Sequence, residues 1–200
     1  MDIFSGDNLI NLIKGVGLLG IFVIVFAESG LFIGFFLPGD SLLFTAGFLA
    51  SQGFLNIALL LLLAFLGAVL GDSVGYFFGK KIGPKIFNRK DSLLFKKENL
   101  LKAQSFYDKY GPKTIILARF VPIVRTFAPI VAGVGEMHYS TFIKFNIIGG
   151  FLWSMGLTLG GYFLGALVPN VDKYLLPIIA LIIFISILPP LYEFIKSKRN

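Results

Sequence analysis

The sequence predicts an all-helical protein that crosses a membrane several times, and three observations carry this prediction. Hydrophobic residues make up 56% of the chain and charged residues only 14%, with a mean hydropathy of +0.84. Several apolar runs have the length of about 20 residues that a helix needs to cross the hydrocarbon core. Two further apolar segments are interrupted by proline and are similar to each other. We therefore expect one membrane domain over 1–200, built from two inverted repeats, each a re-entrant helix-break-helix element followed by a spanning helix.

Membrane helices are expected where apolar residues run without interruption. They cover 9–27 at the N-terminus and spanning segments at 54–79, 140–168 and 174–195. Asp2 and Asp7 precede the first run, so it lacks the basic start of a signal peptide and is expected to remain in the membrane. In the second run, glycines at every fourth residue predict close packing against another helix. These glycines are Gly67, Gly71, Gly75 and Gly79.

The net charge of +7 is concentrated beside the membrane helices. Ten of the 18 lysines and arginines lie in 80–113, and three more lie in 196–199. This positive-inside pattern predicts that 80–113 and the C-terminus are cytoplasmic. Within that basic stretch, 91–110 has leucines at helical spacing between charged residues, which predicts an amphipathic helix against anionic headgroups. A charge distribution that follows the membrane flanks argues against nucleic acid as a partner.

Two segments are expected to be re-entrant because proline interrupts each of them. Residues 30–50 contain Pro38-Gly39-Asp40, and 114–135 contain Pro122 and Pro129. Proline removes a backbone donor and clashes with the preceding turn, so neither segment is expected to form one straight helix. Broken backbone at membrane depth is tolerated only where protein buries it or water reaches it.

The two interrupted segments also look like copies. FLPGDSLLFTAG (36–47) and FVPIVRTFAPIVAG (120–133) share Phe-x-Pro and a closing Ala-Gly, and similar motifs follow, GYFFG at 75–79 and GYFLG at 161–165. Because the cytoplasmic segment lies between the copies, the first is expected to enter from outside and the second from inside. Inverted repeats built on interrupted helices are typical of secondary transporters.

Two cations lie within the second interrupted segment. At membrane depth Arg119 and Arg125 each cost roughly 2.5–3.5 kcal/mol on insertion scales, so each needs a partner or a purpose. A guanidinium fork matches the oxygens of a phosphate and stays charged at any relevant pH. We expect both side chains to bind one phosphate headgroup. The alternative is that they only neutralise Glu28 and Asp40.

Three carboxylates accompany these arginines in apolar surroundings. Glu28 and Asp40 flank the first interrupted segment, and Asp72 lies inside the span 54–79. Burial favours the protonated form of a carboxyl group and a nearby arginine favours the charged form, a balance that suits a proton-coupled gate. For Asp40 helix capping remains open, and for Asp72 a hydrogen bond on the helix face remains equally open.

Other chemistries lack their residues. The chain contains no cysteine and one histidine, His138, so thiolate or histidine-rich metal sites and Ser-His catalysis are not expected. No phosphate loop of the GxxxxGK[ST] type occurs. Trp153 lies in the middle of a predicted helix, where packing is its default role. We expect no catalytic residue, cofactor or metal, and thus no enzyme.

Taken together, these positions resemble the DedA family, also described as the SNARE-associated or VTT domain. The resemblance covers roughly 20–168. It rests on Glu28, Pro38-Gly39-Asp40, Gly71-Asp72 with Gly75-Tyr76, Arg119 with Pro122, Arg125 and Gly133, and Asn146 with Gly149 and Trp153. The resemblance implies a multi-pass protein of the bacterial cytoplasmic membrane that moves undecaprenyl phosphate or phosphatidylethanolamine with dependence on the proton gradient, and it assigns functional roles to Glu28, Asp40, Arg119 and Arg125.

The sequence therefore predicts a lipid transporter, with undecaprenyl phosphate as the preferred substrate. Phosphatidylethanolamine transport or broad scrambling is the alternative within that class. A proton-coupled small-ion transporter with purely structural arginines, and an assembly factor for envelope proteins, are the rivals from other classes. Expected partners are a lipid phosphate headgroup and anionic membrane lipids, and a homo-oligomer is left open.

Overall fold

A computed structural model of the chain describes residues 6–31, 39–86 and 111–167. All regular secondary structure in these ranges is helical, which confirms the predicted all-helical class for this part of the chain. The amphipathic helix expected over 91–110, the C-terminal helix expected over 174–195 and Pro38 lie outside the described residues.

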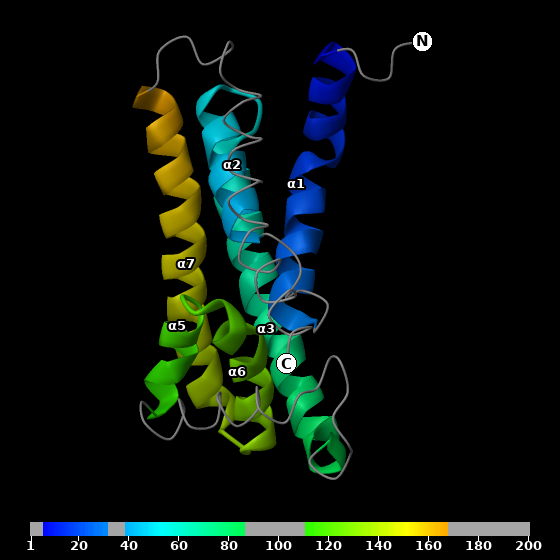
Figure 1. The fold of residues 1–200 in the computed structure, drawn as a ribbon, viewed down its shortest axis with the longest axis vertical. Helices are drawn as coiled ribbons and strands as arrows, with labels where there is room; N and C mark the ends of the chain where they lie inside the picture. The colour runs from blue at the N-terminus through cyan, green and yellow to red at the C-terminus, as the bar shows by residue number, and fades with distance from the viewer. Residues whose placement is uncertain (1–5, 32–38, 87–110, 168–200) are drawn as a thin grey trace, which may run out of the picture. The chain divides into compact units, whose positions relative to one another are not determined.

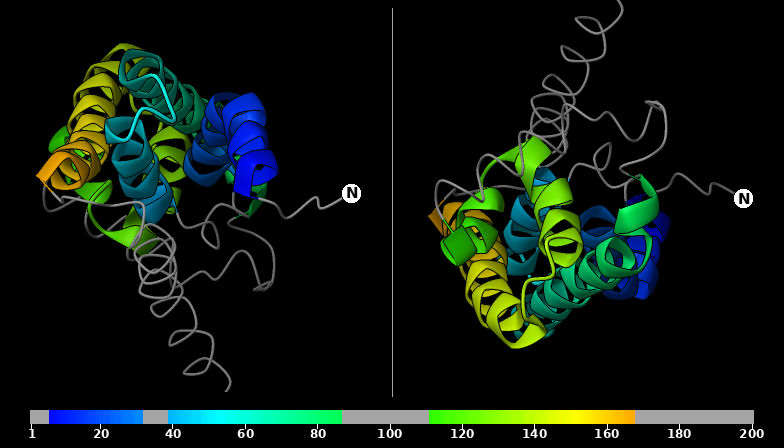
Figure 2. Two further views of the ribbon diagram at one scale, coloured as in Figure 1. Left: turned by 90° about the horizontal axis from the view of Figure 1, so that it is seen from above. Right: turned by 90° about the horizontal axis from the view of Figure 1, so that it is seen from below.

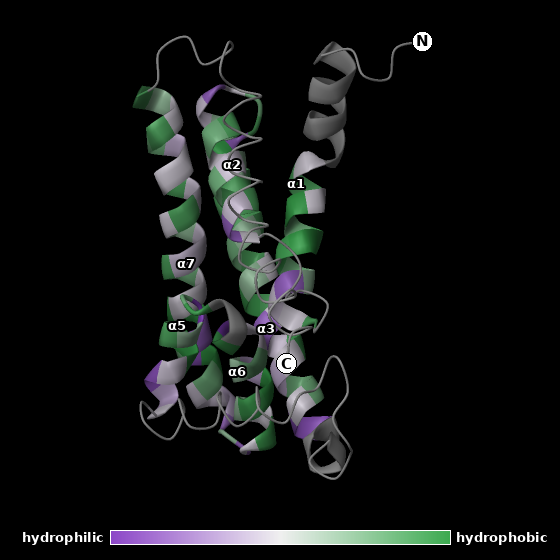
Figure 3. Cartoon of the chain, in the orientation of Figure 1, coloured by the Kyte–Doolittle hydropathy of each residue, from purple (hydrophilic) through white to green (hydrophobic). Residues whose placement is uncertain are grey.

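Seven helical elements make up the described chain (Figure 1). They are α1 (Gly6–Gly30), α2 (Gly39–Ser51), α3 (Ile57–Ile86), the 3-10 helix η2 (Gly111–Lys113), α5 (Thr114–Ala118), α6 (Pro122–Val134) and α7 (Tyr139–Leu167). Within α3 and α7, the segments Ile57–Lys81 and Tyr139–Leu167 are long and apolar enough to cross a membrane. Figure 3 shows these two helices as mostly hydrophobic or neutral.

Contacts divide the chain into two compact units, and three helices contribute to both. α1 divides after Ile21, α3 after Leu63 and α7 after Ser154. Unit 1 contains α2 together with the first parts of α1 and α3 and the last part of α7. Unit 2 contains η2, α5 and α6 together with the other parts of these three helices.

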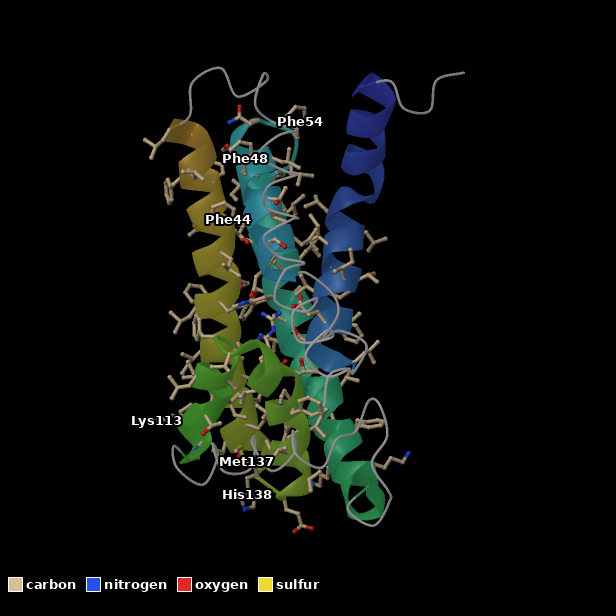
Figure 4. All side chains as sticks on the ribbon, in the orientation of Figure 1. Phe44, Phe48, Phe54, Lys113, Met137 and His138 are labelled. Atoms are coloured by element: carbon tan, nitrogen blue, oxygen red, sulfur yellow. The ribbon has the colours of Figure 1, made fainter. Side chains whose placement is uncertain are left out.

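In unit 1, glycines bring α2 and the end of α7 into backbone contact. A Cβ on Gly47 would overlap the backbone of Thr158, and a Cβ on Gly161 would overlap the backbone of Phe44. Figures 1 and 2 show α2 beside the last turns of α7, and Figure 4 shows Phe44 and Phe48 along α2. Beyond the end of α2, the side chain of Gln52 donates a hydrogen bond from Nε2 to the Gly165 carbonyl of α7 at 2.9 Å.

In unit 2, the glycine stripe of α3 makes the close contacts that its spacing predicts. A Cβ on Gly71 would lie 2.6 Å from the Phe26 carbonyl oxygen of α1, and a Cβ on Gly79 would overlap the backbone of Ile130 in α6. Gly133 of α6 lies equally close to the Tyr76 carbonyl of α3. Two helices therefore approach α3 where it has no side chains, and the packing role predicted for its glycines is confirmed.

An interruption lies within 114–135, between α5 and α6. α5 ends at Ala118, and α6 begins at Pro122 after the turn 119–121. The residue before the proline, Val121, is extended with φ −120° and ψ 105°, because the proline ring disfavours the helical conformation there. At the first position of α6 the missing N–H of Pro122 costs no hydrogen bond. The re-entrant course of this element stays a prediction.

Pro129 does not break the chain, and its prediction as a re-entrant break is wrong. It lies inside α6, which continues to Val134. An internal proline costs a helix about 3 kcal/mol in isolation, but Pro129 is fully buried and lies opposite Gly75, where a Cβ would be 3.4 Å from the proline Cβ. Packing against α3 therefore holds α6 helical through the proline.

The first interrupted segment also differs from its predicted outline. α1 continues to Gly30, and Gly39 and Asp40 are the first two residues of α2 rather than the middle of a break. As an acidic residue in the first turn of α2, Asp40 is favourably placed toward the positive end of that helix dipole.

Candidate functional site

Four charged side chains come together inside unit 2. Glu28, Asp72 and Arg119 are 2%, 4% and 5% exposed, and the side chain of Arg125 is 16% exposed. They come from the last turns of α1, the interior of α3, the turn after α5 and the first turn of α6. Burying an isolated charge is very costly, so such a cluster persists only when its members are paired.

Arg119 is held by acceptors from two helices. Its Nη2 donates to Asp72 Oδ2 at 2.5 Å, to Asn146 Oδ1 at 2.5 Å and to the Ala68 carbonyl at 3.2 Å. Asn146 in turn donates from Nδ2 to the Val69 carbonyl at 3.0 Å. Because the asparagine amide is fixed at both ends, it links α3, α7 and the turn that carries the arginine.

The chain of Arg119 lies along a glycine surface of α7. A Cβ on Gly149 would be 3.2 Å from Arg119 Cδ, and a Cβ on Gly150 would be 3.6 Å from its Nη2. Together with Asn146 and Trp153, these glycines follow the i, i+3, i+4, i+7 spacing of one helix face. We call this face, residues 146, 149, 150 and 153, the arginine slot.

Arg125 forms the second ion pair. Its Nη2 donates to Glu28 Oε1, which joins α6 to the end of α1. Both guanidiniums also lie over the ring of Trp153, with Cζ 5.9 Å from the ring centroid for Arg119 and 5.6 Å for Arg125. Both distances fall within the range of about 6 Å at which an aromatic face attracts a cation.

These groups line a common cavity. Its lining residues are Glu28, Ser29, Asp72, Arg119, Arg125 and Trp153. The cavity volume is about 10 Å³, close to the minimum of roughly 10–15 Å³ that one water needs. A phosphate group is much larger than one water, so a ligand of that size enters only if an arginine–carboxylate pair separates.

The structure brings together four of the five charged residues predicted for the site. Within unit 2, Arg119 pairs with Asp72. Asp40 belongs to unit 1. Asp72 accepts a hydrogen bond from Arg119 as part of an ion pair, so its role is not limited to a hydrogen bond on the face of its own helix. Among the described residues no group of histidine, cysteine or acidic side chains is arranged to hold a metal ion.

Two residues of the site, Asn146 and Trp153, contribute to the family resemblance but were not predicted to belong to the site. Asn146 is a fully buried amide in an apolar helix, and that polarity was a signal for a site role. Trp153 offered no such signal, because a tryptophan in a membrane helix most often packs against its neighbours. Figure 4 shows nitrogen atoms gathered between the ribbons of α3 and α7, where this part of unit 2 is polar.

Comparison with known proteins establishes the family to which this chain belongs. The VTT domain family matches residues 37–163, which include all of α2, α3, α5 and α6 and most of α7. The chain is 49% identical over 181 residues to Protein DedA of Escherichia coli, covering 90% of this chain and 82% of the relative. The chain belongs to the DedA family of membrane proteins.

Further relatives of this chain carry membrane-protein names. An uncharacterized membrane protein of Mycobacterium tuberculosis is 49% identical over 186 residues, covering 90% of this chain and 81% of the relative. The inner membrane protein YqjA of Escherichia coli is 34% identical over 145 residues, covering 72% of this chain and 66% of the relative. No solved structure matches the chain.

Proposed function

We propose that this protein is a transporter that moves a phosphate-bearing lipid across the membrane, with undecaprenyl phosphate as the preferred substrate and protons as the coupling ion. One observation carries the proposal. Two arginines from one interrupted segment, Arg119 and Arg125, lie over a single aromatic ring and line a single buried cavity.

The chemistry of the guanidinium group supports a phosphate ligand. Each guanidinium can donate two parallel hydrogen bonds to the oxygens of one anion, and such charge-assisted bonds are about twice as strong as neutral ones. Lysine would provide charge without this planar fork. Two forks around one cavity suit a tetrahedral group whose oxygens point in several directions.

The small cavity supports an exchange mechanism. In the closed arrangement, Glu28 holds Arg125 and Asp72 holds Arg119. A phosphate enters by replacing a carboxylate on its arginine, and protonation of that carboxylate weakens its hold. Proton uptake by Glu28 would thus release Arg125 for the lipid. We propose Asp40 of α2 as a second member of the proton-coupled gate.

Paired helix contacts support the inverted repeat. In unit 1 the closing glycine of the first copy, Gly47, meets Thr158, and Gly161 three residues later meets Phe44. The α6–α3 interface of unit 2 has a similar arrangement, with Gly133 against Tyr76 and Gly79 against Ile130, one helical turn further along the long helix than the aligned motifs. Each short helix thus packs against the long helix of the other copy, as expected when two copies interlock in the manner of transporter repeats.

Basic residues support the proposed orientation. A Cβ on Gly133 of α6 would lie 2.7 Å from the backbone nitrogen of Lys80, in the part of α3 that contacts α6. Figure 4 shows Lys113, Met137 and His138 at the same end of unit 2. Lys80, Lys113 and His138 are all exposed there. We propose that this end faces the cytoplasm and contacts anionic lipid headgroups.

A second candidate is a proton-coupled small-ion transporter whose arginines are structural. The observation that favours it is that both guanidiniums already have a buried carboxylate partner. A buried pair of this kind can exist for architecture alone. The two candidates differ in whether a phosphorylated lipid competes for the arginines.

Translocation by the purified chain in vesicles tests the proposal. The protein is reconstituted without partners, and the movement of undecaprenyl phosphate, undecaprenol and phosphatidylethanolamine between leaflets is measured with and without an inward proton gradient. We expect undecaprenyl phosphate to move faster than in protein-free vesicles, and faster still with the gradient. Equal rates with and without protein would contradict lipid transport, and faster phosphatidylethanolamine movement would replace the preferred substrate.

A further inference from the structure

Trp153 contacts both arginines of the site. They lie in successive parts of one interrupted segment, the turn after α5 and the first turn of α6, and they pair with carboxylates of different helices, α3 and α1. The indole ring lies within 5.9 Å of both Cζ atoms and is itself only 4% exposed. A ring in that position contacts both cations without neutralising either.

In the proposed exchange mechanism, the Trp153 ring can hold a guanidinium whose carboxylate partner has left. When a ligand replaces Glu28 or Asp72, the released guanidinium loses the partner that fixed its direction. Two like charges facing one cavity also repel each other. The negative face of an aromatic ring attracts a cation, most strongly in a site that water does not reach. Trp153 therefore keeps each guanidinium beside the cavity after its carboxylate has left.

The helix that carries the ring is itself anchored to the site. Asn146 lies two turns before Trp153 on the arginine slot, and its amide is fixed between Arg119 and the Val69 carbonyl. Gly149 and Gly150 let α7 approach the chain of Arg119 closely. Movement of the ring relative to Arg119 would thus disturb several contacts at once. The ring therefore has a fixed position against which the more exposed side chain of Arg125 can pack.

We propose that Trp153 is a positioning residue that holds both arginines toward one anion and thereby selects a phosphate monoester headgroup over a phosphodiester. This inference rests on the proposed function. A monoester carries a charge of roughly −1.5 to −2 at neutral pH, which two convergent guanidiniums match. A phosphodiester has one negative charge and two esterified oxygens, so it uses only part of the same arrangement.

Binding by two substitutions at this position tests the inference. Trp153→Leu removes the aromatic face, and Trp153→Phe keeps a smaller one. Phe151→Leu on the same helix is the matched control, because Phe151 is 52% exposed and does not line the cavity. The probes are undecaprenyl phosphate, undecaprenol, phosphatidylglycerol as a diester, and inorganic phosphate as a competitor without a lipid tail.

We expect the ratio of undecaprenyl phosphate affinity to phosphatidylglycerol affinity to fall about tenfold in Trp153→Leu, a change of about 1.4 kcal/mol. The ratio in Trp153→Phe should lie between those of Trp153→Leu and the wild type, and the ratio in Phe151→Leu should match that of the wild type. Affinity for undecaprenol should not change in any of them. If Trp153→Leu is too unstable to purify, the ratio in Trp153→Phe decides alone.

Trp153 also provides its own signal, because it is the single tryptophan of the chain. In the wild type, undecaprenyl phosphate should change the tryptophan emission and undecaprenol should not. Inorganic phosphate that competes with undecaprenyl phosphate would show that the headgroup alone is recognised, and competition only by lipid-linked phosphate would show that the tail is required. Both results agree with the inference.

Three results would overturn the inference, in two different ways. An unchanged monoester-to-diester ratio in Trp153→Leu, or an equal loss of affinity for all lipids together with a lower melting temperature, would leave lipid transport intact but make the ring purely structural. Equal wild-type binding of undecaprenyl phosphate and undecaprenol would instead remove the proposed function, and this inference with it.

Discussion

The two ion pairs of the site differ in burial and in surroundings. In the pair Arg119–Asp72 the side chains are 5% and 6% exposed, and in the pair Arg125–Glu28 they are 16% and 2% exposed. Arg119 also donates to Asn146 and to the Ala68 carbonyl, and it lies along the glycines of the arginine slot. Arg125 lies in the first turn of α6, the helix that follows the interruption, and its side chain reaches back to the end of α1.

This difference suggests a division of roles between pairs that have the same chemistry. An arginine enclosed by acceptors from two helices resists release, because removing any one acceptor leaves a buried charge poorly compensated. A more exposed arginine at the start of a helix can change partners at lower cost. We therefore expect Arg119–Asp72 mainly to hold the site together and Arg125–Glu28 to be the pair that opens first for a ligand.

The largest expected effect is on stability, from Asp72→Ala. Removing one partner of a buried pair typically costs 3–5 kcal/mol, so we expect a clear fall in melting temperature in detergent. The double variant Arg119→Met with Asp72→Leu should recover most of that stability, since no charge is left unpaired. An unchanged melting temperature in Asp72→Ala would mean that the pair is not an anchor.

A second comparison replaces each arginine by lysine, which keeps the charge and loses the fork. We expect Arg125→Lys to weaken binding of undecaprenyl phosphate about tenfold or more, as for the loss of a charge-assisted hydrogen bond worth roughly 1.5–3 kcal/mol. Its melting temperature should fall less than that of Arg119→Lys. The reverse order, with Arg125→Lys the less stable protein, would exchange the two roles.

A smaller effect is expected from Asn146→Leu. This change removes an acceptor from Arg119 and a donor from the Val69 carbonyl, so it should cost about 1–2 kcal/mol of stability. Binding of undecaprenyl phosphate, measured at a temperature where the variant is folded, should stay within a few-fold of the wild type. A binding loss as large as that of Arg125→Lys would show that Arg119 contacts the ligand as directly as Arg125 does.

The smallest effect concerns protons. Glu28→Gln imitates the protonated carboxyl group and should release Arg125, so we expect undecaprenyl phosphate affinity to rise about threefold near neutral pH, roughly 0.6 kcal/mol. In the wild type, affinity should rise as pH falls, because protonation of Glu28 has the same consequence, and the variant should lose that dependence. Wild-type affinity and pH dependence in Glu28→Gln and Asp40→Asn would refute coupling through these carboxylates.

The helices and the charged members of the site could be predicted from the sequence. Apolar runs of spanning length fix where helices form, and 54–79 and 140–168 correspond to α3 and α7. Arginine and carboxylate side chains among apolar residues are costly, so Glu28, Asp72, Arg119 and Arg125 were candidates without any knowledge of contacts. Hydropathy and desolvation are properties of local sequence, which explains this success.

The pairing within the site could not be predicted, because it depends on how separate helices pack. The sequence did not indicate which carboxylate pairs with which arginine. The close approach of α1 and α6 to the glycine stripe of α3, which helps to place these groups, is a matter of tertiary packing. Pro129 shows the same limit, since burial of α6 against α3 overrides its local preference. Trp153 acquires its role only from two arginines brought together by the turn at 119–121.

The central claim is that this cluster binds a phosphate headgroup. The most direct measurement is the affinity of purified wild-type, Arg119→Ala and Arg125→Ala proteins for undecaprenyl phosphate and for undecaprenol. We predict that the wild type binds the phosphorylated lipid more tightly and that Arg125→Ala, with Arg119→Ala where it remains folded, binds both lipids equally. Equal binding of the two lipids by the wild type and both variants would contradict the account and make the arginines structural.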